Sequence, residues 1–140
     1  MTILFDSKNK TFHLQAKNTS YVMQVIRDGY LVHLYWGDKI KKYRQSNPLA
    51  FIDRGFSPNP DPLDRTMSLD TIPHEYPTYG NGDFRTPAYQ IQLENGSTVT
   101  DLRYQTHRIY EGKPSLEGLP ATYVENADES ETLEIIMIDQ

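Results

Sequence analysis

The sequence predicts an all-β fold in which antiparallel strands form two packed sheets. Short runs of β-branched and aromatic residues alternate with polar residues, which is the pattern of strands with one wet face. Pro and Gly interrupt the chain throughout, and no window sustains the 3.6-residue spacing of a helix. Turn dipeptides such as Asp28-Gly29 separate the apolar runs. Together these observations indicate a β-sandwich.

The first expected strands cover residues 2–5 and 10–15. The clearest local signal follows at residues 20–37, where two runs rich in β-branched and aromatic residues flank Asp28-Gly29. An Asp-Gly pair readily adopts the two positive φ angles of a type I′ turn. We therefore expect residues 20–37 to form a β-hairpin.

A second hairpin is predicted over residues 88–104, with its turn at Asn95-Gly96. Apolar and polar residues alternate on both sides of that turn, which is typical of a sheet with one solvated face. The returning strand is expected to continue through residues 105–112.

The end of the chain is expected to hold a loop at residues 113–121, a short strand at 122–125, a turn at 126–130 and a last strand at 131–140. The last strand is strongly apolar and no polar tail follows it. A terminal strand of this kind would form an unprotected sheet edge. We therefore expect residues 1–140 to be part of a longer chain, truncated at the C-terminal end.

The composition argues against several functional classes. The net charge is −5, and the one basic run, "KIKKYR" at residues 39–44, is typical of a solvated strand edge or turn, so nucleic-acid binding is not expected. No cysteine is present, which excludes disulfides and thiolate metal sites and fits a cytoplasmic protein. We find no signal-peptide pattern and no apolar run near the roughly 18 residues of a membrane span, so no membrane partner is expected.

The sequence contains an unusually long polar segment, "DTIPHEYPTYGNGDFRTPAYQIQ", at residues 70–92. Ordinary connections in a compact domain have about 4–6 residues, and longer ones tend to be functional or disordered. No histidine pair has metal-ligand spacing, and the "YGNGDF" glycines precede no helix that could hold a phosphate. We therefore expect neither a metal nor a cofactor.

Carboxylates, aromatic rings and guanidinium groups gather in and before this segment. A carboxylate pair could serve a glycosidase, although Asp in such turns usually caps the turn itself. Flat rings beside charged hydrogen-bonding groups suit polyhydroxylated ligands, although the same rings could pin the loop onto the sandwich. The carboxylates are Asp53, Asp61, Asp64, Asp70, Glu75 and Asp83. The rings are Trp36, Tyr76, Tyr79 and Phe84, and the guanidinium groups are those of Arg65 and Arg85.

Three stretches resemble one known family. Residues 75–88 read "EYPTYGNGDFRTPA", close to an E-(Y/F)-P-x-(Y/F)-G-x-G-D-(Y/F)-R-x-P-A signature. The upstream "LVHLYWGDKI" and the later "DLRYQTHRIYEGKPSLEGLPATYV" match further segments of the same family, except that Thr106 stands where Ser is common. On these stretches, nearly the whole chain resembles the N-terminal domain of bacterial family 36 α-galactosidases.

The resemblance implies a β-sandwich of the supersandwich, galactose-mutarotase-like type, placed before a catalytic (β/α)8 barrel. The barrel of that family carries the aspartates of a retaining mechanism, and no "K-W-D-x-N" type motif occurs in this chain. The resemblance therefore implies that residues 1–140 are a partial N-terminal domain without catalytic residues. This fragment alone is expected to be inactive.

The resemblance also implies a role for the loop at residues 51–65. In tetrameric members this domain lends a loop to the active-site mouth of a neighbouring subunit, which would place Phe51, Asp53 and Arg65 near the galactosyl group. The implied partners are the enzyme's own barrel, neighbouring subunits of a homotetramer and melibiose- or raffinose-type galactosides. Two alternatives remain open, a stand-alone carbohydrate-binding module built on Trp36 and the tyrosines, and a domain that binds only protein.

Overall fold

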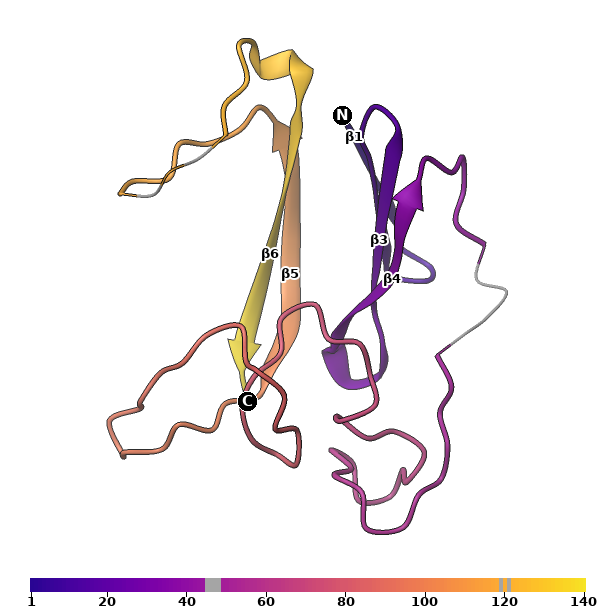
Figure 1. The fold of residues 1–140 in the computed structure, drawn as a ribbon, viewed down its shortest axis with the longest axis vertical. Coiled ribbons are helices and arrows are strands. Elements are labelled where there is room, and N and C mark those ends of the chain that lie inside the picture. Colours follow the sequence, from indigo (N-terminus) through magenta and orange to yellow (C-terminus); the bar gives the residue numbers. More distant parts are fainter. Residues whose placement is uncertain (45–48, 119, 121) are drawn as a thin grey trace.

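The computed structural model describes residues 1–44, 49–118, 120 and 122–140, and its strands form two antiparallel sheets (Figure 1). The first sheet has the order β1-β2-β3-β4 and the second pairs β5 with β6. The strands are β1 (Thr2–Asp6), β2 (Thr11–Gln15), β3 (Thr19–Val25), β4 (Leu31–Asp38), β5 (Leu102–Glu111) and β6 (Glu131–Asp139). Within the described residues, the helical structure is limited to two short 3-10 turns, η1 (Arg27–Gly29) and η2 (Ala127–Glu129). The predicted all-β, two-sheet architecture is confirmed.

The hairpin predicted over residues 20–37 is present as β3 and β4. The Ile26 amide donates to the Tyr30 carbonyl over 2.9 Å and closes the ladder at the turn. Asp28 and Gly29 have φ angles of 59° and 89°, the left-handed pair that an Asp-Gly turn was expected to supply. This hairpin is therefore determined locally, by the strand-forming runs and the turn between them.

The second predicted hairpin is wrong in its first strand and in its pairing, but its turn and the predicted continuation of its returning strand through residues 105–112 are confirmed, the latter by β5. Leu93 and Ser97 close a turn through a 2.8 Å backbone hydrogen bond, and Gly96 has a φ of 83°. No ladder joins the arms of this turn in the described structure, and the next strand, β5, pairs with β6 instead. The β5–β6 ladder runs from Leu102–Asp139 to Glu111–Glu131 and turns an apolar face toward the other sheet. Alternation specifies a strand but not its partner, and burial against the first sheet selects β6.

Two further predictions concern the segment before β6. Residues 122–125 form no strand, and Tyr123 there is 79% exposed, so the short strand predicted at this place is wrong because nothing packs on it. The turn predicted at 126–130 is confirmed by η2. Residues 113–118 are loop as predicted, while positions 119 and 121 lie outside the described residues.

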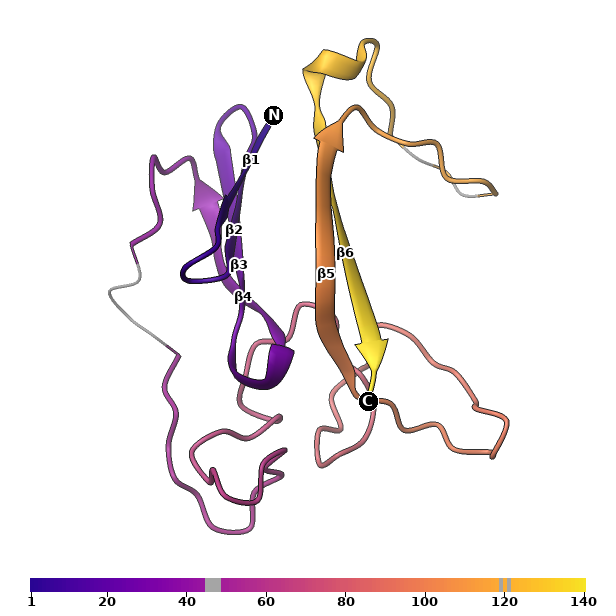
Figure 2. The same cartoon turned by 180° about the vertical axis from the view of Figure 1, so that it is seen from behind.

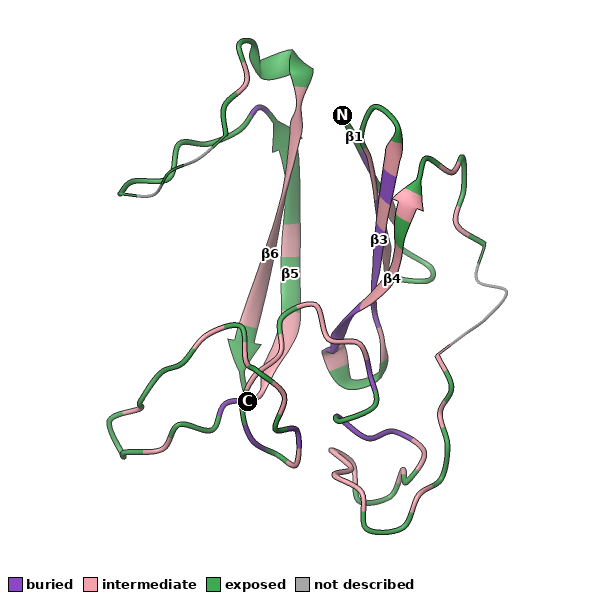
Figure 3. Ribbon diagram, viewed as in Figure 1, coloured by how far each residue is buried: buried purple, intermediate pink, exposed green. Residues whose placement is uncertain are grey.

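The apolar residues form one core between the two sheets. Its centre is Phe12 in β2, which is fully buried and lies 4.8 Å from the His107 ring of β5, centroid to centroid. Figure 2 shows β5 and β6 standing opposite the four-stranded sheet, and Figure 3 shows that burial is deeper in the four-stranded sheet. Other residues of this core are Met23, Val25, Leu31, Tyr104, Leu133, Ile135 and Met137.

A second core lies on the opposite face of the four-stranded sheet. Leu31 belongs to the first core and Val32 to the second, as expected for neighbours in a strand, whose side chains point to opposite faces. The second core contains Tyr30, Val32, Met67, Leu69 and Ile72. Met67 and Leu69 come from the stretch before the long polar segment and Ile72 from its beginning, so residues 67–72 form a folded cover for the sheet rather than a plain connector.

Candidate functional site

The long polar segment begins by attaching itself to the edge of β4. The His33 amide donates to the Pro73 carbonyl over 2.8 Å, and the Glu75 amide donates to the Leu31 carbonyl over 3.0 Å. His74 forms an isolated bridge with Val32 between these two bonds. The start of the segment is therefore held by backbone hydrogen bonds, which fix where its side chains lie.

The Glu75 carboxylate is held on both oxygens. One oxygen accepts from the Tyr21 hydroxyl over 2.5 Å, and the other lies 3.0 Å from His33 Nδ1. Burial raises the pKa of Tyr21, and the hydrogen bond to Glu75 raises it further. Glu75 therefore ties the segment to β3 and β4.

The centre of the "YGNGDF" stretch is a tight two-residue turn. Gly80 and Asp83 exchange backbone hydrogen bonds of 3.1 and 2.9 Å, and the two residues between them, Asn81 and Gly82, have φ angles of 52° and 80°. The Asp83 side chain is buried and accepts from Arg85 Nε over 2.9 Å. The buried Asp83 side chain thus stabilises the turn region, which is the structural role that turn chemistry predicted for it.

Arg85 links this turn to the second core. Its Nη2 donates to the Leu69 carbonyl over 2.9 Å, while its Nε bonds Asp83. His74 Nε2 lies 3.7 Å from Asp83 Oδ2, and its ring meets the edge of Tyr30. The charged side chains of residues 75–88 therefore attach this stretch to the rest of the fold.

We expect the free energy of unfolding to decrease as the pH is lowered, because His74 is buried. Burial lowers the pKa of its imidazole below the ordinary 6.5, with Arg85 adding to this and Asp83 opposing it. The unfolded chain then binds the proton more readily, so the contribution of His74 is complete above about pH 6.5 and is lost as pH falls below that value.

Urea unfolding at about pH 7.5 and about pH 5.5 measures this effect, and the His74→Gln variant should show a smaller loss between them. Burial also lowers the pKa of His13, so the double variant His13→Gln, His74→Gln should flatten the dependence further. An unchanged pH dependence in His74→Gln would contradict the assignment.

The three residues singled out in the 51–65 loop divide into two environments. Asp53 Oδ1 and Arg65 Nη2 lie 3.1 Å apart, and their side chains are 61% and 58% exposed. Phe51 is partly buried against the second core, and the Arg27 guanidinium lies 4.3 Å from its ring centroid. The structure thus brings Asp53 and Arg65 together at the surface, while Phe51 packs against the second core.

The remaining acidic residues near the loop all have internal partners. Asp61 accepts from the Leu63 amide over 2.8 Å, and Asp64 pairs with Arg27 over 2.5 Å. Asp70 pairs with Arg54 over 2.7 Å, a hydrogen bond that lowers the pKa of Asp70. These contacts support turn and loop chemistry for the three carboxylates.

The aromatic rings form two separate pairs. Tyr76 stacks on Tyr89 at 5.7 Å, and Tyr79 meets Phe84 edge-on at 5.8 Å. Trp36 is 74% exposed on β4, and no ring contact joins it to either pair in the part of the chain that the structure describes. The rings therefore do not form one continuous platform.

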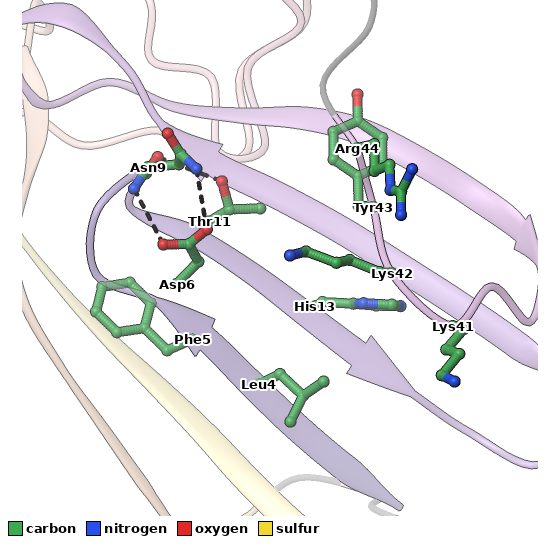
Figure 4. Close-up of a pocket in the computed structure, with 10 residues that line it drawn as sticks. All are labelled: Leu4, Phe5, Asp6, Asn9, Thr11, His13, Lys41, Lys42, Tyr43 and Arg44. Carbon is green, nitrogen blue, oxygen red and sulfur yellow. Dashed lines mark hydrogen bonds between the residues drawn. The ribbon is translucent and has the colours of Figure 1, made fainter.

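Residues 41–44 of the basic run line a cavity of about 730 Å³ over the outer face of β1 and β2 (Figure 4). The run is not a strand, because β4 ends at Asp38. Lys42 extends over His13 toward Asp6, whose carboxylate is already held by Asn9. This arrangement agrees with a solvated turn.

The described ranges contain no cluster of three or more His, Asp or Glu side chains placed to hold a metal ion. The same ranges contain no helix long and apolar enough to span a membrane.

Sequence reasoning missed the importance of Asn81. The Asn81-Gly82 dipeptide carries a turn signal like that of the first hairpin, and turn chemistry was expected for "NGDF", but nothing local indicates that Asn81 would line a cavity. The turn places the Asn81 side chain in a cavity with residues from four other parts of the chain.

Together the fold and these loops define a β-sandwich domain whose long connections carry the candidate site residues. Comparison with known families identifies the family within this class. The family model described as the glycosyl hydrolase family 36 N-terminal domain matches residues 29–140, so the chain belongs to that family.

Individual relatives agree with the family match. Alpha-galactosidase AgaA of Geobacillus stearothermophilus is 62% identical over 139 residues, which cover 99% of this chain and 19% of AgaA. The crystal structure of AgaB from the same organism superposes with a TM-score of 0.89 at 63% identity, covering 99% of this chain and 19% of AgaB. An AgaA structure in complex with stachyose has a TM-score of 0.87 at 65% identity and covers 93% of this chain and 18% of AgaA. The chain thus spans about a fifth of the length of these relatives.

Proposed function

We propose that this chain is the non-catalytic N-terminal domain of a retaining α-galactosidase that hydrolyses terminal α-D-galactosyl residues of melibiose- and raffinose-type sugars. Membership of the family supports the proposal, as do the relative AgaA and its structures in complex with raffinose and stachyose. The catalytic residues would lie in a (β/α)8 barrel elsewhere in the parent enzyme. The absence of cysteine fits a cytoplasmic enzyme.

The observation that carries the proposed role is the exposed pair of Asp53 and Arg65. It lies on a loop that also exposes Ile52, Phe56 and Leu63. Apolar side chains around a charged pair are typical of a contact surface. We infer that this loop reaches the active-site mouth of a neighbouring subunit in a homotetramer, where Asp53 accepts from galactose hydroxyls and Arg65 orients it.

Replacing Asp53 or Arg65 with alanine in the assembled parent enzyme should lower kcat/KM by about 10- to 100-fold, the cost of a hydrogen bond to a charged group. Thermal unfolding should change little, because an exposed ion pair contributes only about 0–1 kcal/mol. Steady-state kinetics with raffinose and a melting curve measure the two effects.

The matched control is Arg108→Ala, which removes another exposed ion pair, the one with Glu134 on the β5–β6 sheet. It should leave both kinetics and stability unchanged. If Asp53→Ala and Arg65→Ala leave kcat/KM at the level of this control, the loop contacts only protein. Measurable turnover of an α-galactoside by residues 1–140 alone would contradict the non-catalytic assignment.

The exposure of Trp36 favours one alternative, a carbohydrate-binding module that works without a barrel. This alternative requires saturable binding of galactose or melibiose by the isolated chain, lost in Trp36→Ala. Isothermal titration of the chain and of that variant distinguishes it from the proposed role.

A further inference from the structure

A small polar cavity lies between residues 58–60 in the middle of the 51–65 loop, the Asn81-Gly82 turn and the start of β5. Its volume is about 250 Å³. Ligand pockets commonly hold about 300–1,000 Å³, so this cavity has room for a single small ring. The lining residues that matter here are Tyr30, Pro58, Pro60, Asn81, Asp101 and Arg103.

One wall of the cavity is a rigid hydrogen-bonded group. Asp101 Oδ2 accepts from Arg103 Nη2 over 2.7 Å, from Arg103 Nε over 3.1 Å and from the Tyr30 hydroxyl over 3.4 Å. The Arg103 guanidinium lies 4.9 Å from the Tyr30 ring centroid. Among the described residues, no group donates to Asp101 Oδ1, so this oxygen is free to accept a hydrogen bond from a ligand.

Asn81 also lines the cavity. Left-handed backbone holds Asn81 in its turn, and its side chain makes no hydrogen bond within the described part of the chain. The turn cannot move away easily, because Gly82 lies directly against the Pro58 ring. Asn81 is exposed at the cavity, and its amide keeps both a donor and an acceptor unused by the described residues.

These groups select a class of ligand. An acceptor at Asp101, a donor at Arg103 and both functions at Asn81 match the hydroxyls of a sugar, while Pro58 and Pro60 offer apolar surface to its C–H groups. The negative charge of the Asp101 carboxylate would repel an anion. The Arg103 guanidinium, which is paired with that carboxylate, would repel a free cation.

We propose that this cavity binds one neutral sugar ring, at a site separate from the Asp53–Arg65 loop pair. The proposal does not rest on the galactosidase assignment, because the cavity is built entirely from residues of this chain. An open site for a single ring should bind in the range of about 1–10 mM.

The test is a titration of the isotope-labelled 140-residue chain with D-galactose, followed by NMR. The Asn81 side-chain amide and the Arg103 Nε–H signals should shift saturably. Asn81→Gly removes the amide while keeping a residue that accepts the left-handed turn, so the fold is retained. Affinity should fall at least about tenfold in Asn81→Gly and in Asp101→Asn.

Two controls separate this site from the surfaces discussed above. The double variant Asp53→Ala, Arg65→Ala and the variant Trp36→Ala should bind as tightly as the wild type. The proposal is overturned if the wild type shows no saturable shift, if Asn81→Gly binds unchanged, or if either control variant loses binding. None of these outcomes affects the kinetic test in the parent enzyme, so the two proposals can fail separately.

Discussion

Replacing Phe12 with alanine is expected to destabilise the chain by about 3–5 kcal/mol, the usual cost of removing a buried aromatic ring. The ring is fully buried and stacks on Phe5 at 4.6 Å within its own sheet. It also meets Tyr104 and His107 of the opposite sheet at 6.4 and 4.8 Å. Its loss would leave a cavity where the two sheets meet, at the centre of the core that they share.

Urea unfolding followed by circular dichroism measures this loss. Trp36→Ala is the matched control, because it removes an even larger ring that is 74% exposed, and it should cost less than about 0.5 kcal/mol. Equal losses in the two variants would show that Phe12 does not hold the sheets together.

The second large effect is expected from Gly82→Ala. A Cβ at this position would lie 2.0 Å from Pro58 Cβ, and the backbone has a φ of +80°. The left-handed backbone costs an L-residue about 1–2 kcal/mol, and the collision adds roughly 1–3 kcal/mol of overpacking. We expect a total loss of about 2–5 kcal/mol, together with displacement of Asn81 from the sugar cavity.

Gly96→Ala separates the two contributions. Gly96 has nearly the same φ of +83°, but nothing lies within 4 Å of a Cβ built there. Its cost should be only the backbone share, about 1–2 kcal/mol. If urea unfolding gives the same loss for both glycines, the close approach of the turn to Pro58 contributes nothing to stability.

The parts of the fold that sequence predicted correctly are those determined by neighbours in the chain. The β3–β4 hairpin follows from two strand-forming runs around Asp28-Gly29, and both φ angles came out as that dipeptide requires. The strands at either end of the chain were also located correctly, because their apolar alternation is strong.

The errors share a different cause. Residues 88–94 alternate as a strand does, but the strand expected to pair with them, β5, buries its apolar face by pairing with β6. Ordinary turn residues precede Asp83 in the sequence. Nothing local indicates that its side chain would be buried between Arg85 and His74. In both cases the outcome depends on packing against residues distant in sequence.

The candidate site divides in the same way. Sequence resemblance pointed to Asp53 and Arg65, and the structure pairs them at the surface across a loop. The resemblance did not point to the cavity lined by Asn81, Asp101 and Arg103. These residues meet only after the turn, the loop and β5 have packed together.

By itself, the sequence determined the all-β class, the first hairpin, the outer strands and the family, because each rests on local alternation, turn dipeptides or an unbroken motif. The tertiary structure alone decided which strands pair, which face of the sheet the 49–72 stretch covers and which polar groups share a cavity. Those outcomes depend on how much apolar surface each arrangement buries, and no stretch of neighbouring residues contains that information.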